Sequence, residues 1–257
     1  MNKNLIGRNY RAAIVMLVIV AFGISMAAAP LELPGGNVQI RVESGNLVLR
    51  GDDRDNNIVI TENSIHGRAG TTVNGQRHRF IPDGVTNDVV IIMRGGNDFV
   101  RVELPGTNFA LPHDLVLSMG SGNDNIELLQ VKAPNETRIN TGIGDDIVFI
   151  DGVLGVNEYI RPEFTGKFQL LAGSGDDLLE FHHTIFHGPV DVRLGEGIDG
   201  ACSTQDSDFQ LPDQTSFIGG LPVAFPGDGF VAPDIQLTQL IGFEFFPDDC
   251  SFLGGRY

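Results

Sequence analysis

The sequence lacks the short motifs of several common catalytic sites. It contains no GxSxG nucleophile elbow, no HExxH helix, no phosphate-binding loop and no CxxC pair. Tryptophan is also absent, and no segment carries a convincing helical stripe of apolar residues. These absences leave no recognisable enzyme site of those four kinds, and they favour an all-β chain.

Positive charge is scarce. The chain has 17 Lys and Arg residues against 33 Asp and Glu residues, which gives a formal net charge of −16 at pH 7. So strong a negative charge argues against binding to nucleic acid or to an anionic membrane surface. Cations are therefore the natural partners of this protein.

The N-terminal segment resembles an export signal. Basic residues at Lys3, Arg8 and Arg11 precede an almost wholly apolar run over residues 12–29, and residues 25–27 (SMA) offer a small-x-small cleavage site. We expect residues 1–29 to be a signal peptide and the mature protein to be secreted, periplasmic or at the cell surface, without membrane insertion after cleavage. The apolar run also reaches the short limit of a membrane helix, so an uncleaved anchor is the alternative.

Cysteine is limited to Cys202 and Cys250. An even pair in an exported chain predicts a disulfide. It would close a loop of about 48 residues and stabilise the fold by roughly 3 to 4 kcal/mol. Two reduced, buried thiols are the alternative, which requires that the chain is not exported.

One turn motif recurs along the chain. It reads GSGNDNI at 120–126, GIGDDIV at 142–148 and GSGDDLL at 173–179, with looser copies at 94–100 and 195–201 and the most degenerate copy at 52–58. At its second acidic position, the steps from Asp98 to Asp199 are 26, 22, 31 and 22 residues. A period near 22 is the length of one solenoid coil.

Short β-forming runs flank these turns. Val190, Val192 and Leu194 alternate with polar residues, which is the period of a strand with one buried face. Two glycines before paired Asn or Asp residues suit a corner of a coiling chain better than a tight hairpin, which favours Asn-Gly. The sequence therefore predicts an all-β fold, a right-handed parallel β-helix of about 22-residue coils.

Three segments are predicted: the signal peptide at 1–29, the β-helix at 30–200, and a disulfide-fastened C-terminal cap at 201–257 that covers the last strand edge. The step from Asn56 to Asp98 is 42 residues, close to two coils. We therefore expect one coil, around residues 71–81, to have lost its Gly-Asp corner.

The turn motif resembles the nonapeptide GGxGxDxUx of haemolysin-type (RTX) calcium-binding repeat proteins, where U is a large apolar residue. The matching positions are Gly120, Gly122, Asp124 and Ile126; Gly142, Gly144, Asp146 and Val148; and Gly173, Gly175, Asp177 and Leu179. The first glycine of the nonapeptide is replaced each time, by Met119, Thr141 and Ala172. True arrays repeat every nine residues, whereas one copy per coil here would leave calcium turns on one edge only.

The resemblance implies calcium ions between consecutive turns, held by carboxylates and by backbone carbonyls. The implied ligand residues are Asn97, Asp98, Gly120, Gly122, Asn123, Asp124, Gly142, Gly144, Asp145, Asp146, Gly173, Gly175, Asp176, Asp177 and Asp199.

A metal-free corner is the alternative, because stacked Asn and Asp side chains can hydrogen-bond to neighbouring backbone. Against it, the Asp-Asp pairs at 145–146 and 176–177 would stack like charges within about 5 Å. That repulsion lowers stability unless a cation intervenes.

Two catalytic or metal alternatives remain. Parallel β-helices also carry polysaccharide lyases and glycoside hydrolases, which use a basic residue or paired carboxylates. The candidates by residue type are scattered: Lys132, Arg138, Arg161 and Lys167. A zinc site could use Glu180, His182, His183 and His187, although their spacing matches no zinc signature.

The sequence is best interpreted as an exported, calcium-binding β-solenoid with a structural or adhesive role. Its expected partners are calcium ions and an extracellular polysaccharide or another surface. A lyase or hydrolase on a β-helix, and a metal-free β-helix with an Asn/Asp ladder, are the alternatives.

Overall fold

The computed structural model describes residues 35–104, 111–154, 159–203 and 207–219, together with the backbone of three strands between residues 228 and 245. All of them belong to one compact unit, Pro34–Tyr257. These residues form β-strands, turns and one 3-10 helix, η1 (Pro212–Gln214), with no α-helix among them. In this part of the chain, no helix has the length and apolar character needed to span a membrane.

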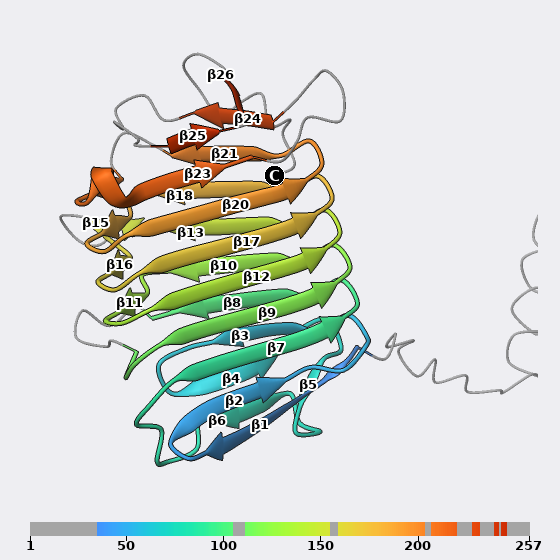
Figure 1. The fold of residues 1–257 in the computed structure, drawn as a ribbon. Helices are drawn as coiled ribbons and strands as arrows, with labels where there is room; N and C mark the ends of the chain where they lie inside the picture. The colour runs from blue at the N-terminus through green and yellow to red at the C-terminus, as the bar shows by residue number, and fades with distance from the viewer. Residues whose placement is uncertain are drawn as a thin grey trace, which may run out of the picture. The chain divides into compact units, whose positions relative to one another are not determined.

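Two ten-stranded sheets contain most of the strands (Figure 1). The first sheet has the order β25 (Gln239–Ile241), β23 (Thr215–Ile218), β20 (Val190–Glu196), β17 (Phe168–Ser174), β12 (Thr137–Ile143), β9 (Leu115–Ser121), β7 (Val89–Gly95), β2 (Asn46–Arg50), β1 (Asn37–Glu43) and β5 (Thr72–Val73). The second has the order β26 (Phe243–Phe245), β24 (Asp228–Val231), β21 (Gly200–Ser203), β18 (Leu178–His182), β13 (Ile147–Asp151), β10 (Asn125–Leu129), β8 (Phe99–Glu103), β3 (Asn57–Ile60), β4 (Ser64–Gly67) and β6 (His78–Phe80).

Two smaller sheets complete the described fold. A four-stranded sheet contains β11 (Lys132–Ala133), β16 (Glu163–Phe164), β19 (Ile185–Phe186) and β22 (Asp208–Phe209). A hairpin is formed by β14 (Val153–Leu154) and β15 (Tyr159–Ile160).

The two large sheets are stacks of parallel strands. In the first sheet every pairing from β2 to β25 is parallel, and in the second every pairing from β3 to β26 is parallel. Equivalent residues are in register, so that Gly120, Gly142, Gly173 and Gly195 follow one another across four strands. The all-β prediction with stacked parallel strands is confirmed.

The core lies between the two large sheets and the four-stranded sheet. The alternation predicted over Val190, Val192 and Leu194 is confirmed, since all three side chains are at most 1% exposed. Farther along the interior, aromatic rings stack, and the Phe164 and Phe186 ring centroids lie 5.3 Å apart. Such buried aromatic pairs combine large apolar area with a preferred ring geometry, which fixes one packing arrangement of the interior.

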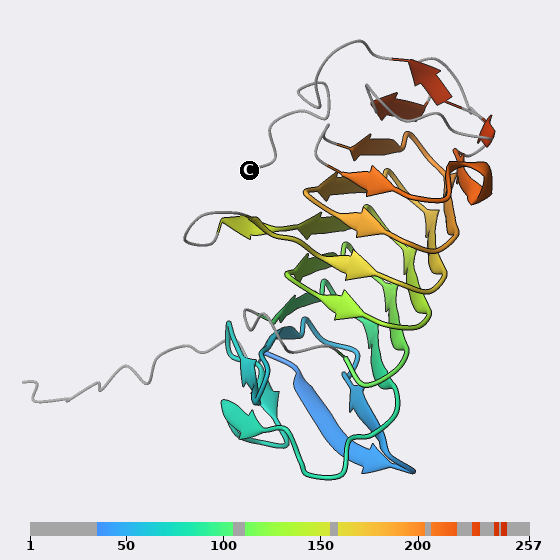
Figure 2. The ribbon, with the colours of Figure 1, turned by 90° about the vertical axis from the view of Figure 1, so that its left-hand side faces the viewer.

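The step of 31 residues between Asp146 and Asp177 contains an insertion rather than a longer coil. The hairpin β14–β15 lies within it and projects from the stack (Figure 2). The flanking strands β12 and β17 still pair in register. Because a surface insertion adds little loop-closure cost, the regular stacking is preserved around it.

The N-terminal part corrects one prediction. Strands β1 and β2 pair antiparallel, as do β3 with β4 and β4 with β6, while β2 and β3 pair directly with β7 and β8. The 42-residue step is therefore a single step with an inserted antiparallel segment, and the predicted coil at residues 71–81 is wrong. Asn74 and Gly75 turn the chain there with φ of 48° and 75°, as expected of an Asn-Gly hairpin turn.

Beyond residue 200 the parallel pairing continues through β21, β23, β24, β25 and β26. Cys202 in β21 is 1% exposed and disulfide-bonded. Cys250 lies outside the described residues, so its predicted pairing with Cys202 stays a prediction. The predicted cap at 201–257 also stays a prediction.

Candidate functional site

The turn motifs stack at the corners where the chain passes from the first large sheet to the second (Figure 1). The inner column is the set of buried side chains Asn56, Asp98, Asp124, Asp146, Asp177 and Asp199, which are 0 to 4% exposed. The outer column is the set of Asp and Asn residues immediately before the first five of them, Asp55, Asn97, Asn123, Asp145 and Asp176. The structure thus brings the predicted acidic and amide residues together, including the degenerate first and last copies.

Each inner carboxylate binds the backbone of the preceding corner. The N–H of Asp98 donates to Asp124 Oδ1 at 2.7 Å, and the N–H of Asp124 donates to Asp146 Oδ1 at 2.8 Å. The same bond recurs from Asn56 to Asp98, from Asp146 to Asp177 and from Asp177 to Asp199, at 2.7 to 2.9 Å. One oxygen of every inner carboxylate is therefore committed to a backbone N–H.

The outer column makes the same bond in the opposite direction. The N–H of Asn123 donates to Asn97 Oδ1 at 2.9 Å, and the N–H of Asp145 donates to Asn123 Oδ1 at 3.1 Å. Asp55, Asp145 and Asp176 accept equivalently from the corner that follows each of them. Consecutive corners are consequently linked twice, once by an inner and once by an outer side chain.

The second oxygen of the inner carboxylates, Oδ2, does not accept such a hydrogen bond. Oδ2 of Asp98, Asp124, Asp146 and Asp177 is buried and has no hydrogen-bond partner among the described residues. A buried acceptor left unpaired costs about 1 to 3 kcal/mol, and more when it is charged. Like Asn56 Oδ1, which is also buried without a hydrogen-bond partner among the described residues, these four oxygens are unpaired acceptors of the inner column.

Burial also makes these groups hard to ionise. Desolvation raises the pKa of Asp98 to about 6, of Asp124 to about 7 and of Asp177 to about 8, and it raises the pKa of Asp146. Neighbouring carboxylates raise the pKa further, and the backbone N–H bonds only partly offset the increase. Burial thus favours the binding of protons or of a cation by the inner column over bare carboxylates.

The motif glycines have a steric role of their own. Gly142 has a φ of 114°, and a Cβ there would lie 2.0 Å from the carbonyl oxygen of Gly120 in the preceding corner. Gly144 has a φ of 131°, and its Cβ would lie 2.1 Å from the Gly122 oxygen. The backbone carbonyls of Gly120 and Gly122, which were predicted as calcium ligands, therefore lie against the next corner. Gly173 and Gly175 occupy the equivalent positions one corner beyond Gly142 and Gly144. Close approach of the corners explains the glycines without an ion.

One group of possible metal ligands was not predicted. Asp88, His113 and Asp114 are, among the described residues, the one set of three His, Cys, Asp or Glu side chains with ligand atoms within 4.8 Å of one another. His113 Nδ1 lies 2.8 Å from Asp88 Oδ1 and 3.3 Å from Asp114 Oδ1. Asp88 and Asp114 immediately precede equivalent strands 26 residues apart, a spacing that could have revealed them.

In the corner columns, by contrast, a cation would contact at most two described carboxylates and would need carbonyl or water oxygens as well.

The basic residues considered for catalysis do not converge. Lys132 pairs with Glu163 at 3.2 Å and Lys167 with Asp191 at 3.7 Å. Arg138 pairs with Glu136, and Arg161 Nε donates to the His183 carbonyl at 3.0 Å. Each of these four basic side chains therefore has a local partner, and the four do not face a common site.

The histidines considered for zinc separate in the same way. His182 Nε2 lies 3.2 Å from Glu180 Oε2, on the shared face that the alternation predicts. His183 instead contacts Asp151 at 2.9 Å, and His187 contacts Gln210 at 2.8 Å. The structure does not bring these four candidate residues together around one point.

Comparison with family models, with curated proteins and with solved structures finds no match to this chain. The resemblance to RTX repeats therefore depends on the residues of the turn motif alone.

Proposed function

We propose that residues 30–200 form a right-handed parallel β-helix with about 22 residues per coil, in which the antiparallel strands β1, β4 and β6 are an insertion. The segment 201–257, whose strands extend both large sheets in parallel, would act as its C-terminal cap. Support comes from the parallel pairing in both large sheets and from the 22-residue spacing of the corner bonds at Asp124–Asp146 and Asp177–Asp199. The right hand follows from the general preference of parallel crossovers.

On this framework we propose an exported structural or adhesive protein whose corner column binds calcium. The observation that carries the proposal is the row of buried Oδ2 atoms at Asp98, Asp124, Asp146 and Asp177, which have no partner among the described residues. A chain with a net charge of −16 gains stability when a cation neutralises such a row.

Calcium suits these oxygens because it takes six to eight hard oxygen ligands in a flexible geometry. An ion between successive corners would use one or two inner carboxylates, with backbone carbonyls and water for the remainder. Binding to the folded state alone would couple folding to calcium, so that the column is completed outside the cell, where calcium is plentiful.

A metal-free ladder is the second candidate, and a specific observation favours it. Oδ1 of every inner carboxylate and Oδ1 of every outer residue already accepts a backbone N–H, and close packing explains the glycines. In that case a proton on Oδ2 would take the place of the cation. The lyase or hydrolase alternative has no comparable support among the described residues, because its basic candidates are separately paired.

Asp146→Asn separates the two candidates. The amide keeps an Oδ1 acceptor for the N–H of Asp124 and removes the carboxylate. If the column binds calcium, isothermal titration calorimetry will show calcium affinity at least about tenfold weaker than in the unaltered protein. In chelator the variant will unfold at a higher temperature, because a buried charge has been removed.

Asp83→Asn is the matched control, since Asp83 is exposed and lies outside both columns. Equal calcium affinity in the two variants would mean that calcium does not use the column. No calcium heat in any of the three proteins would identify the metal-free ladder.

A further inference from the structure

The cluster of Asp88, His113 and Asp114 lies away from the Gly-Asp corners, at the opposite ends of the same strands. Asp88 immediately precedes β7 and Asp114 immediately precedes β9, whereas the corners follow the other ends of these two strands. The side chains of Asp88, His113 and Asp114 are 31%, 54% and 22% exposed. An ion from solution can therefore reach all three side chains.

The distances within the cluster match those between ligands of one metal ion. Two donor atoms bonded to one zinc ion at about 2.1 Å lie about 3 to 3.4 Å apart. His113 Nδ1 lies 2.8 Å from Asp88 Oδ1 and 3.3 Å from Asp114 Oδ1. A small rotation of the exposed imidazole is enough to admit an ion, with His113 binding through Nδ1 and keeping its proton on Nε2.

Backbone N–H groups orient both carboxylates of the cluster. The N–H of Asp114 donates to Asp88 Oδ1 at 3.3 Å, and the N–H of Glu136 donates to Asp114 Oδ1 at 3.1 Å. Oδ2 of each aspartate has no hydrogen-bond partner among the described residues. Each carboxylate is therefore held in place through one oxygen while the other remains available to an ion, which is how hydrogen bonds outside a metal site orient its ligands.

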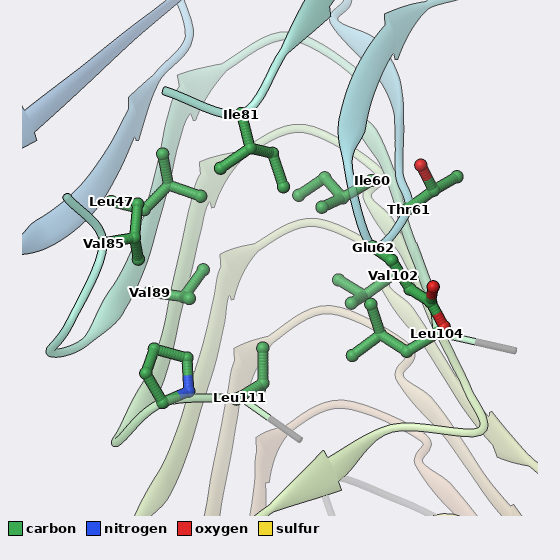
Figure 3. A pocket seen from close by; sticks show the side chains of 11 residues that line it. Leu47, Ile60, Thr61, Glu62, Ile81, Val85, Val89, Val102, Leu104 and Leu111 are labelled. Carbon is green, nitrogen blue, oxygen red and sulfur yellow. The ribbon is translucent and has the colours of Figure 1, made fainter. Parts of the chain in front are cut away.

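The backbone beside the cluster is anchored in the core. Val89 follows Asp88, Leu111 precedes His113 by two residues, and both line the apolar pocket shown in Figure 3 at 5% exposure. The N–H of Val89 also donates to the Asp114 carbonyl at 2.9 Å. Ligands on so firmly held a backbone need little rearrangement to bind an ion.

The donor set and the local charge identify the class of ion. Imidazole is a ligand of zinc, copper, iron and nickel, whereas calcium takes oxygen ligands. Glu136 adds a third carboxylate beside the two aspartates, and its partner Arg138 offsets one of the three charges. Three carboxylates against one guanidinium leave two negative charges, which a divalent cation neutralises.

We propose that Asp88, His113 and Asp114 bind one divalent transition-metal ion. Three protein ligands leave at least one coordination position to water, as in open zinc sites. The ion would connect the segments that enter β7 and β9. Because its donors include an imidazole and lie at the other ends of the strands, this site is independent of calcium binding at the corners.

Zinc is the probe, added to the oxidised protein at about pH 7.5 in the presence of millimolar calcium, which occupies oxygen-only sites first. Isothermal titration calorimetry should show zinc binding with a micromolar Kd. His113→Gln and Asp88→Asn should each weaken it at least about tenfold. His187→Gln and Asp83→Asn are the matched controls for loss of one imidazole and of one carboxylate, and both should leave zinc affinity unchanged.

Imidazole nitrogen resonances locate the ion independently of affinity. Zinc should shift Nδ1 of His113 and leave the ring of His187 unaffected. The proposal is overturned if the unaltered protein does not bind zinc at micromolar concentration, or if the controls weaken binding as much as His113→Gln and Asp88→Asn do. It is equally overturned if millimolar calcium abolishes zinc binding, because the site would then be an oxygen site for hard cations.

Discussion

In the presence of a chelator, the free energy of unfolding should decrease by several kcal/mol as the pH rises from about 5 to about 8, since each unit of pKa shift is worth about 1.4 kcal/mol. The folded-state pKa values of Asp98, Asp124 and Asp177 are raised to about 6, 7 and 8. The folded protein therefore holds protons more tightly than the unfolded chain. Their contribution to stability is complete below the unfolded pKa of about 4 and is lost as the pH passes through these raised values.

Urea unfolding at a series of pH values measures this decrease. Asp124→Asn should flatten the pH dependence because it removes one buried titrating group, whereas Asp176→Asn at the exposed outer column should leave it nearly unchanged. Stability that stays constant or increases from about pH 5 to about pH 8 in chelator would contradict the burial of this column.

Gly142→Ala should destabilise the protein by about 3 kcal/mol or more. Its φ of 114° is unfavourable for alanine, which alone costs roughly 1 to 2 kcal/mol. The added Cβ would also lie 2.0 Å from the Gly120 carbonyl oxygen, and an overlap with backbone can be relieved only by separating two corners. Separation lengthens the corner hydrogen bonds as well, which is why the expected loss exceeds the conformational cost.

Gly84→Ala isolates the conformational part of that effect. Gly84 has a φ of 88°, and a Cβ there would meet no atom within 4 Å. Its substitution should therefore cost only about 1 to 2 kcal/mol. Equal losses of unfolding free energy in the two variants would show that the corners are not held in close contact at Gly142.

The corners could be predicted because their geometry is encoded locally. Glycines at positive φ, an Asx pair and a buried apolar residue recur within seven positions, so even the degenerate copies at Asn56 and Asp199 align with the others. The alternation of strand residues likewise identifies the buried face. These signals need no knowledge of distant residues.

The direction of the strands is harder to predict from the sequence than the corners are. Alternation with a period of two shows which face of a strand is buried, and it is the same in parallel and antiparallel strands. Alternation therefore does not distinguish the antiparallel strands β1, β4 and β6 from the parallel strands of the stack. The Asn74-Gly75 turn is a local signal of a hairpin there, which the 42-residue spacing alone does not reveal.

The chemistry of the candidate sites depends on long-range pairing. The spacing of Asp124 and Asp146 predicts that they are neighbours, but not that one oxygen binds a backbone N–H while the other stays unpaired. Leu47, Glu62 and Leu111 line one pocket of the fold, although the sequence separates them widely. No periodic pattern marks such a set.

The most direct test of calcium binding at the corners is thermal unfolding of the oxidised protein at about pH 8. At this pH more of the inner carboxylates are ionised than at neutral pH, so a bound cation stabilises the folded protein more. Melting would be compared in chelator, in millimolar calcium and in millimolar magnesium as the control for charge screening. The proposed calcium column predicts a rise specific to calcium of roughly 5 to 10 °C, as expected when the ion is present at about 100 times its dissociation constant. Identical melting temperatures in calcium and magnesium would contradict it and leave the column as a hydrogen-bonded ladder without metal.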